Sequence, residues 1–208
     1  MEPRTDVASG ASRRAGRMQH LSGSRWGLAA GALALGFGVA YALALTNHVT
    51  EDAIKYVKDS LVGGEALFHP HHLFYHGLMA GVVRIVDVGA TQIDRAVETM
   101  QVANVLISVA TVLAYFAICL RVGASVSRAL TFTLLFGLSS AFFQFSSQVE
   151  VYNATALCSC LGILGMVTPK DDWRRRALVA SGFFFAMSFH QVGIFLGVAI
   201  LVGEALRL

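Results

Sequence analysis

Two adjacent carboxylates, Glu51 and Asp52, follow directly after a long apolar run. A carboxylate held near a bilayer surface can act as a general base, because it can take the proton of an acceptor hydroxyl that meets a lipid-borne substrate there. The same residues fit the start of a helix, with Thr50 as N-cap and the two acids in the first turn. Both interpretations can hold together, so Asp52, with Glu51 as the alternate, is the first candidate for catalysis.

Four of the seven histidines lie within residues 69–76, and His72 and His76 are one helical turn apart. Three interpretations stay open: these side chains bind a divalent metal ion, hydrogen-bond to a phosphate or sugar, or lie at headgroup depth as interfacial residues. The spacing matches no strong zinc template, so no metal ligands are assigned. His69, His71 and His72 remain candidates for substrate contact.

Three further candidates, Glu150, Tyr152 and His190, interrupt or border apolar runs. Glu150 lies at a membrane boundary, where an ionisable side chain is a functional candidate; as an alternative, it is a helix N-terminal acid. His190 and Gln191 form the polar break in a stretch of about 30 apolar residues, and such breaks face a protein interior or a water cavity. The alternative is that they only satisfy the backbone at a turn.

These polar groups stand out because the rest of the 208-residue chain is strongly apolar. Hydrophobic residues make up 55% and charged residues only 14%, against ~25% in soluble domains. The mean hydropathy is +0.62. A soluble fold would expose too much apolar surface, and a disordered chain would be more polar, so both classes are excluded. The composition predicts an integral membrane protein.

The net charge of +3 is located in one segment. Residues 1–25 carry five arginines against two acids, whereas basic and acidic side chains balance over residues 26–208. We therefore predict a basic, disordered, cytoplasmic tail followed by a multi-spanning membrane domain. No basic stretch with interleaved aromatic residues occurs elsewhere, which excludes a nucleic-acid partner and leaves the lipid bilayer.

Several apolar runs predict an all-α polytopic bundle. Residues 26–45 are uncharged and long enough to cross the ~30 Å core, and they exceed the ~7–15 residues of a signal-peptide core. The other runs are residues 99–120, 129–145, 151–167 and 177–206. The last run is too long for one span and is expected to form two short helices that break near His190.

Residues 73–86 are too short for an ordinary span and contain Arg84, which favours an interfacial or re-entrant helix over a crossing. If this segment does not cross, the remaining basic clusters fall on the cytoplasmic side, as the positive-inside rule requires. Residues 46–97 then form a large extracytoplasmic loop with a net charge of −2. The candidate acids and histidines would gather on this one face of a plasma or inner membrane.

Four sequence stretches together resemble the GT-C-type membrane glycosyltransferases, in particular an uncharacterised branch related to protein O-mannosyltransferases. They are TEDAIKYV, FHPHHLFYHGLMAGVVRIV, FQFSSQVEVYNATAL and FFFAMSFHQVGIFLGVAIL, and they occur in family order over about residues 26–206. Such enzymes place an acidic dipeptide in the first extracytoplasmic loop as catalytic base. They generally have more spans, so the resemblance implies the N-terminal portion of such an enzyme.

The resemblance implies a polyprenyl-phosphate sugar as donor and inverting attack by an acceptor hydroxyl. Asp52 would be the base and the histidines of residues 69–72 would hold the phosphate, while Glu150, Tyr152 and His190 would line the cavity. A divalent cation is possible as a cofactor but is not implied by the residues. Two other hypotheses are a non-catalytic or truncated membrane subunit and a metal-handling protein built on the histidine cluster.

Overall fold

The computed structural model describes residues 6–46, 49–68, 72, 74–168 and 173–205, and within these residues it is helical and has no β-strand. The helices are α1 (Asp6–Leu43), α2 (Glu51–Val62), η1 (Gly64–Leu67), α3 (Tyr75–Ile85), α4 (Ile93–Arg121), α5 (Val126–Gly137), α6 (Ser140–Ser146), α7 (Tyr152–Met166), α8 (Trp173–Phe189), η2 (Gln191–Gly193) and α9 (Ile194–Ala205). The prediction of an all-α fold is confirmed.

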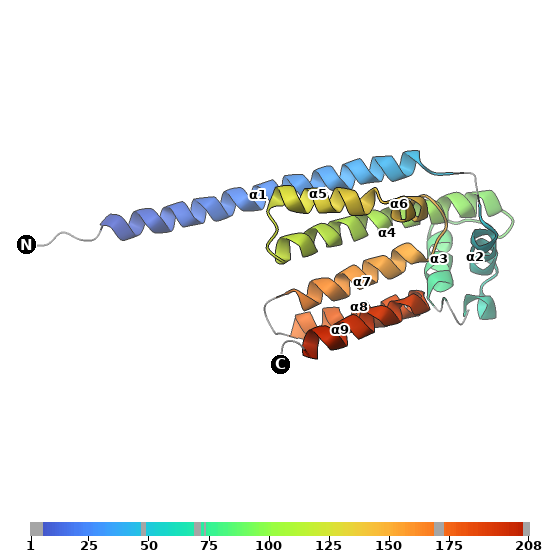
Figure 1. Ribbon diagram of the computed structural model, residues 1–208. Coiled ribbons are helices and arrows are strands. Elements are labelled where there is room, and N and C mark those ends of the chain that lie inside the picture. The colour runs from blue at the N-terminus through green and yellow to red at the C-terminus, as the bar shows by residue number, and fades with distance from the viewer. Residues whose placement is uncertain (1–5, 47–48, 69–71, 73, 169–172, 206–208) are drawn as a thin grey trace, which may run out of the picture.

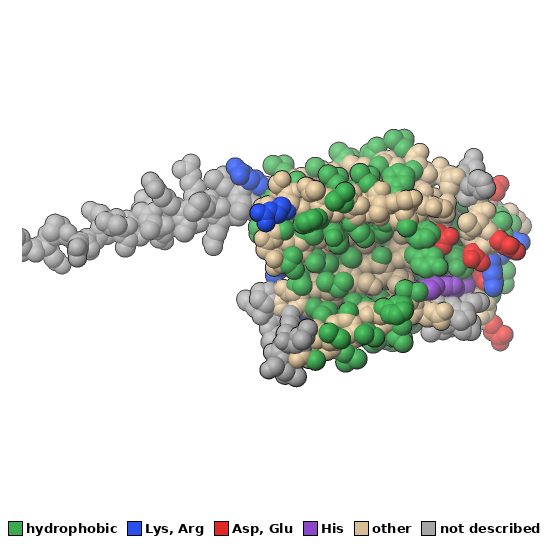
Figure 2. Space-filling model, in the orientation of Figure 1, with side chains coloured by type: hydrophobic (Ala, Val, Ile, Leu, Met, Phe, Trp, Pro, Cys, Tyr) green, Lys and Arg blue, Asp and Glu red, His purple; other side chains and the backbone are tan. Residues whose placement is uncertain are grey.

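Helices α1, α4, α5, α7, α8 and α9 lie roughly side by side along one direction, whereas α2, α3 and α6 gather at one end (Figure 1). Helix α4 contacts α1 and α5 as well as α7, and α7 packs closely against α8. We call the end that holds α2, α3, α6 and the break at residues 190–193 the polar end. The opposite end, which we call the basic end, carries Arg25, Arg121, Arg128, Arg174, Arg175 and Arg176. In Figure 2 the acidic side chains (red) gather at the polar end, next to some basic ones (blue), whereas the charged side chains seen at the basic end are blue.

Within the residues that the structure describes, two helices are long and apolar enough to cross a membrane, namely Arg25–Leu43 within α1 and the whole of α4. They correspond to the predicted runs 26–45 and 99–120. The predicted run 129–145 differs, because it divides into α5 and α6 with a bend of 69° and counts at most as one broken span. Helix α7 and the stretch Gln191–Gly203 are apolar but shorter than a full span.

Residues 6–25 also differ from the sequence prediction. A disordered tail is expected over residues 1–25, but α1 begins at Asp6 and continues into the span without a break. A helix that is already nucleated extends at little cost, and Ala, Arg, Met and Gln in this segment are good helix formers. The backbone of the basic segment is therefore an extension of the helix that contains the first candidate span.

The predicted break at His190 is confirmed. Helix α8 ends at Phe189, and η2 joins it to α9. The two helices then run back along each other, and both the start of α8 and the end of α9 lie at the basic end (Figure 1). His190 is consequently placed at the polar end.

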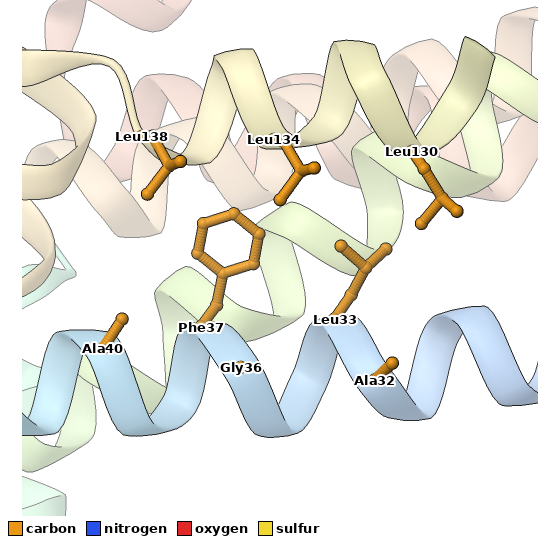
Figure 3. Close-up of a pocket in the computed structure, with 8 residues that line it drawn as sticks. All are labelled: Ala32, Leu33, Gly36, Phe37, Ala40, Leu130, Leu134 and Leu138. Atoms are coloured by element: carbon orange, nitrogen blue, oxygen red, sulfur yellow. The ribbon is translucent and has the colours of Figure 1, made fainter. Parts of the chain in front are cut away.

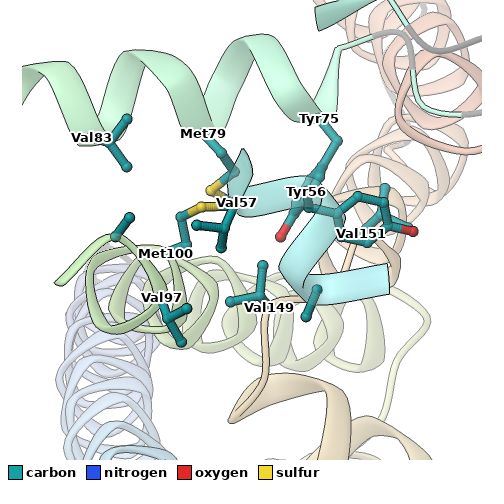
Figure 4. Close-up of a cluster of buried hydrophobic side chains, with 11 residues drawn as sticks. Tyr56, Val57, Tyr75, Met79, Val83, Val97, Met100, Val149 and Val151 are labelled. Atoms are coloured by element: carbon teal, nitrogen blue, oxygen red, sulfur yellow. The ribbon is translucent and has the colours of Figure 1, made fainter. Parts of the chain in front are cut away.

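Helix α3 has only 11 residues and lies at the polar end instead of running along the bundle (Figure 1). It is held there by a buried cluster that joins α2 and α3 to the first half of α4 (Figure 4). Val57, Met79 and Met100 meet in this cluster and are fully buried. Helix α3 is therefore positioned by its packing against α2 and α4, and the interfacial or re-entrant placement of residues 73–86 stays a prediction.

A second buried cluster joins α1, α4 and α5. The Tyr41 hydroxyl donates a hydrogen bond of 2.9 Å to the carbonyl oxygen of Gly137, which ties α1 to α5. An apolar groove of about 410 Å³ lies between the two helices, and Phe37 and Leu134 project into it (Figure 3). No polar side chain lines this groove, so it offers no groups for acid–base chemistry.

Candidate functional site

Helix α2 presents three polar side chains on one face at the polar end. Thr50 caps the helix, because its hydroxyl accepts a 3.1 Å hydrogen bond from the backbone N–H of Ala53. The predicted N-cap is therefore confirmed. Asp52, Lys55 and Tyr56 follow at spacings of three and four residues, which places them on the same side of the helix.

These three side chains line a small cavity of about 90 Å³ together with His72 and His76. Asp52, and not Glu51, lines this cavity, so the structure distinguishes the two adjacent acids by the direction in which the helix turns them. Lys55 adds a positive charge that could pair with an anion. The cavity thus combines a carboxylate, an ammonium group and two imidazoles within a few residues of a candidate span.

Aromatic and imidazole rings connect this cavity to the break between α8 and α9. The Tyr56 hydroxyl lies 3.3 Å from Nε2 of His72. The His72 ring centroid lies 5.0 Å from that of His190, which in turn lies 5.0 Å from the ring of Tyr152. Three predicted site residues, His72, Tyr152 and His190, are therefore brought together from three separate segments of the chain.

The hydrogen bonding of His190 fixes one of its ring nitrogens as an acceptor. Its Nδ1 accepts a 3.1 Å hydrogen bond from the backbone N–H of Val192. The neutral ring then carries its proton on Nε2. His190 thus satisfies the backbone at the turn through Nδ1 and is a hydrogen-bond donor through Nε2, and its predicted contact with substrate stays a prediction.

Glu150 is buried next to this group of rings, with only 8% of its surface exposed. Burial, together with the negative charge of Asp52, raises the pKa of the Glu150 carboxyl from 4.5 to about 7. Burial and then the charges of Asp52 and Glu150 also raise the pKa of the Tyr56 phenol well above its usual range. Near neutral pH, therefore, Glu150 can take up or release a proton while Tyr56 stays protonated.

The backbone around Glu150 is held by two buried asparagines. Nδ2 of Asn104 donates to the carbonyl oxygens of Gln148 (2.7 Å) and Glu150 (2.9 Å). Nδ2 of Asn153 donates to the carbonyl oxygen of Phe145 (2.7 Å). The valines on both sides of Glu150 are buried, so the backbone of this segment is fixed by packing as well as by hydrogen bonds. The Glu150 carboxyl is thereby held near enough to Asp52 for the charge of Asp52 to act on it.

We expect Asn104→Ala to lower the free energy of unfolding in detergent by about 1–3 kcal/mol, because the carbonyl oxygens of Gln148 (part-buried) and Glu150 (buried) lose the hydrogen bonds that this amide donates. Guanidinium or thermal unfolding followed by circular dichroism measures the change. The exposed amide of Gln144 provides the control, and Gln144→Ala should leave stability unaltered. Equal stabilities of N104A and Q144A would contradict the role given to Asn104.

Sequence reasoning did not name Lys55, Tyr56 or Asn104 as parts of this site, and it included His76 only as a member of the histidine cluster. Tyr56 and Lys55 could have been found from their helical spacing after Asp52. Asn104 is one of few polar residues in the apolar helix α4, which was a usable signal. His76 is fully buried with its ring 5.3 Å from that of Tyr56, so its contribution depends on packing that the sequence does not display.

His69 and His71 lie outside the described residues, so their predicted substrate contacts stay predictions. Within the part of the chain that the structure describes, no three His, Cys, Asp or Glu side chains are grouped to hold a metal ion. The polar groups that are described offer acid–base and hydrogen-bonding chemistry.

Neither a known protein family, nor a curated protein, nor a solved structure matches this chain.

Proposed function

We propose that the polar end is the reaction site of a membrane glycosyltransferase that uses a polyprenyl-phosphate sugar as donor. The observation that carries this proposal is the cavity in which Asp52 lies beside Lys55, Tyr56, His72 and His76, next to the buried Glu150. A base, an ammonium group and several hydrogen-bond donors are the groups that transfer of a sugar from a phosphate requires. The order of the matching sequence stretches, which resembles GT-C-type enzymes, adds to this support.

The depth of the site favours a lipid-linked donor. The stretch of α4 from Asn104 to Arg121 measures about 25 Å at the usual helical rise. If Arg121 lies at one surface of the ~30 Å hydrocarbon core, Asn104 and the bonded Glu150 segment lie close to the other surface. A phosphate attached to a membrane lipid is held at the same level, so it can enter the site from the leaflet.

In the proposed reaction, Asp52 takes the proton of an acceptor hydroxyl as the hydroxyl oxygen attacks the anomeric carbon. The new bond joins the acceptor oxygen to that carbon, and the bond from the carbon to the phosphate oxygen breaks. The leaving polyprenyl phosphate keeps the electron pair, and its negative charge is stabilised by Lys55 and by the imidazole of His72. Attack opposite to the leaving group inverts the anomeric configuration.

The proposed orientation places the basic end in the cytoplasm and the polar end outside it. The exposed arginines support this orientation, because cytoplasmic segments carry an excess of Lys and Arg. The chain is then polytopic, and the segment from the end of α1 to the start of α4 is an extracytoplasmic loop with α3 at the membrane surface. A plasma or inner membrane location is part of the same proposal.

The proposal is tested with the full chain reconstituted in liposomes that contain polyprenyl-phosphate mannose labelled in the sugar. Release of polyprenyl phosphate, with transfer of label to a panel of hydroxyl acceptors, is the expected result. Repeating the assay with EDTA shows whether a divalent cation takes part. Absence of both donor binding and phosphate release, with mannose and with glucose donors, would contradict the proposal.

A pH dependence of stability follows from Glu150. Its pKa is about 7 in the folded protein and 4.5 as the ordinary value, so between these pH values the folded state binds more protons than the unfolded state. Stability therefore falls as the pH rises from 4.5 to 7 and levels off above 7, as far as this group contributes. In Glu150→Gln this contribution is absent.

The measurement is the unfolding free energy of the wild type and of E150Q at several pH values in one detergent. The stability of E150Q relative to wild type should increase with pH across this window. Glu51→Gln serves as control, since Glu51 is an exposed acid on the same end. A difference between E150Q and wild type that does not change with pH would rule out a raised pKa.

A further inference from the structure

The basic end exposes five arginines, which come from four different helices. They are Arg25 of α1, Arg121 of α4, Arg128 of α5, and Arg174 and Arg176 of α8. Among the side chains that the structure describes, all Asp and Glu residues belong to α2, η1, the start of α4, or the turns before α4 and α7, which lie at the polar end. Asp171 and Asp172 precede α8 in the sequence but lie outside the described residues, and the side chains of Asp6 in α1 and Glu204 in α9 are likewise not among those described.

Both tryptophans of the chain belong to this same end. Trp26 directly follows Arg25 and is 47% exposed, while Trp173 begins α8 and is 70% exposed. The guanidinium carbon of Arg174 lies 5.7 Å from the centre of the Trp173 ring. Exposed tryptophan beside arginine is typical of the headgroup level, where the ring meets acyl chains and the cation meets phosphates.

We propose that the basic end binds the headgroups of anionic phospholipids in the leaflet that it faces. Guanidinium groups fit phosphate oxygens in a two-pronged manner, and several of them around one bundle end attract negative lipids from the surrounding leaflet. The partner is therefore a lipid surface with net negative charge. This inference does not depend on the proposed transferase activity, because it concerns the opposite end of the molecule.

The position of the tryptophans gives a direct measurement. The full chain is reconstituted in liposomes that contain either brominated phosphatidylglycerol or brominated phosphatidylcholine, with the same total lipid composition. Bromine quenches tryptophan only at short range, so both fluorophores of the chain report on lipids at the basic end. We expect quenching by phosphatidylglycerol to exceed that by phosphatidylcholine about twofold or more at low salt, and the excess to shrink at 1 M salt.

Two double variants locate the effect. Arg121→Gln/Arg128→Gln removes two charges at the basic end without altering the Arg174–Trp173 contact, and it should lower the quenching ratio toward one. The matched control is Lys58→Gln/Arg84→Gln, which removes two exposed charges at the polar end and should keep the ratio. Unchanged quenching by phosphatidylcholine confirms that each variant is inserted as the wild type is.

A ratio of one for the wild type would overturn the proposal. A raised ratio that persists in R121Q/R128Q and also in Arg174→Gln/Arg176→Gln would overturn it as well, because the preference would then arise elsewhere. Loss of the ratio in the control variant would show a general charge effect in place of a site at the basic end.

Discussion

Replacing Asp52 by Asn should reduce sugar transfer by about 10²–10⁴-fold, the usual contribution of a general base. The amide has the same shape as the carboxylate but cannot accept the proton of the acceptor hydroxyl. Asp52 is exposed and forms part of the cavity wall, so the substitution leaves no buried group without a partner. The readout is the rate of polyprenyl phosphate release under single-turnover conditions.

Glu51→Gln is the matched control for this experiment. Both acids lie in the first turn of α2 and favour the helix dipole equally, so the two variants lose the same small amount of helix stability. Only Asp52 lines the cavity. Transfer that survives in D52N but is lost in E51Q would assign the base to Glu51, and full activity in both variants would remove this acidic pair from the mechanism.

Gly182→Ala should destabilise the bundle by about 2–3 kcal/mol, as an added methyl group does in a tightly packed contact. A Cβ atom at position 182 would lie 2.5 Å from the backbone nitrogen of Gly162 and 2.8 Å from the carbonyl oxygen of Cys158. These neighbours are backbone atoms and cannot rotate away, so α7 and α8 would have to separate. Thermal unfolding in detergent, followed by circular dichroism, measures the loss.

Gly31→Ala is the control, since a Cβ atom there meets nothing within 4 Å. It replaces glycine by a better helix former in the interior of α1, and we expect a small gain in stability of up to about 1 kcal/mol. Both variants replace glycine by alanine, but we expect G182A to lower the free energy of unfolding and G31A to raise it. A destabilisation of G31A as large as that of G182A would show that packing between α7 and α8 is not the cause.

Much of the architecture could be predicted because polar residues are rare in this chain. The break at His190 stands out as a polar interruption of a long apolar stretch, and the structure has it there. The short segment around Arg84 forms the 11-residue helix α3, and its predicted place at the membrane surface stays a prediction. The bend between α5 and α6 was not predicted, because Ser139 and Ser140 are weak signals in an apolar run.

The candidate site was only partly predictable from the same residues. The sequence placed the acids and histidines on one face of the membrane, and the structure brings Asp52, His72, Glu150, Tyr152 and His190 to one end. It could not show that Asn104 reaches the Glu150 segment, since that contact depends on how α4 packs against a turn 44 and 46 residues away. Such long-range pairings are set by packing and leave no local pattern.

The segment from Phe145 to Asn153 has a consequence for how the length of this turn can vary. Val149 and Val151 are buried on either side of Glu150, while Asn104 holds the backbone at Gln148 and Glu150 and Asn153 holds it at Phe145. An insertion or deletion of one residue between these anchors would put a valine in the place of the carboxylate and push the carboxylate into the apolar cluster. Most loops tolerate insertions. In this loop, however, an activity that depends on Glu150 would require the number of residues between Phe145 and Asn153 to stay the same.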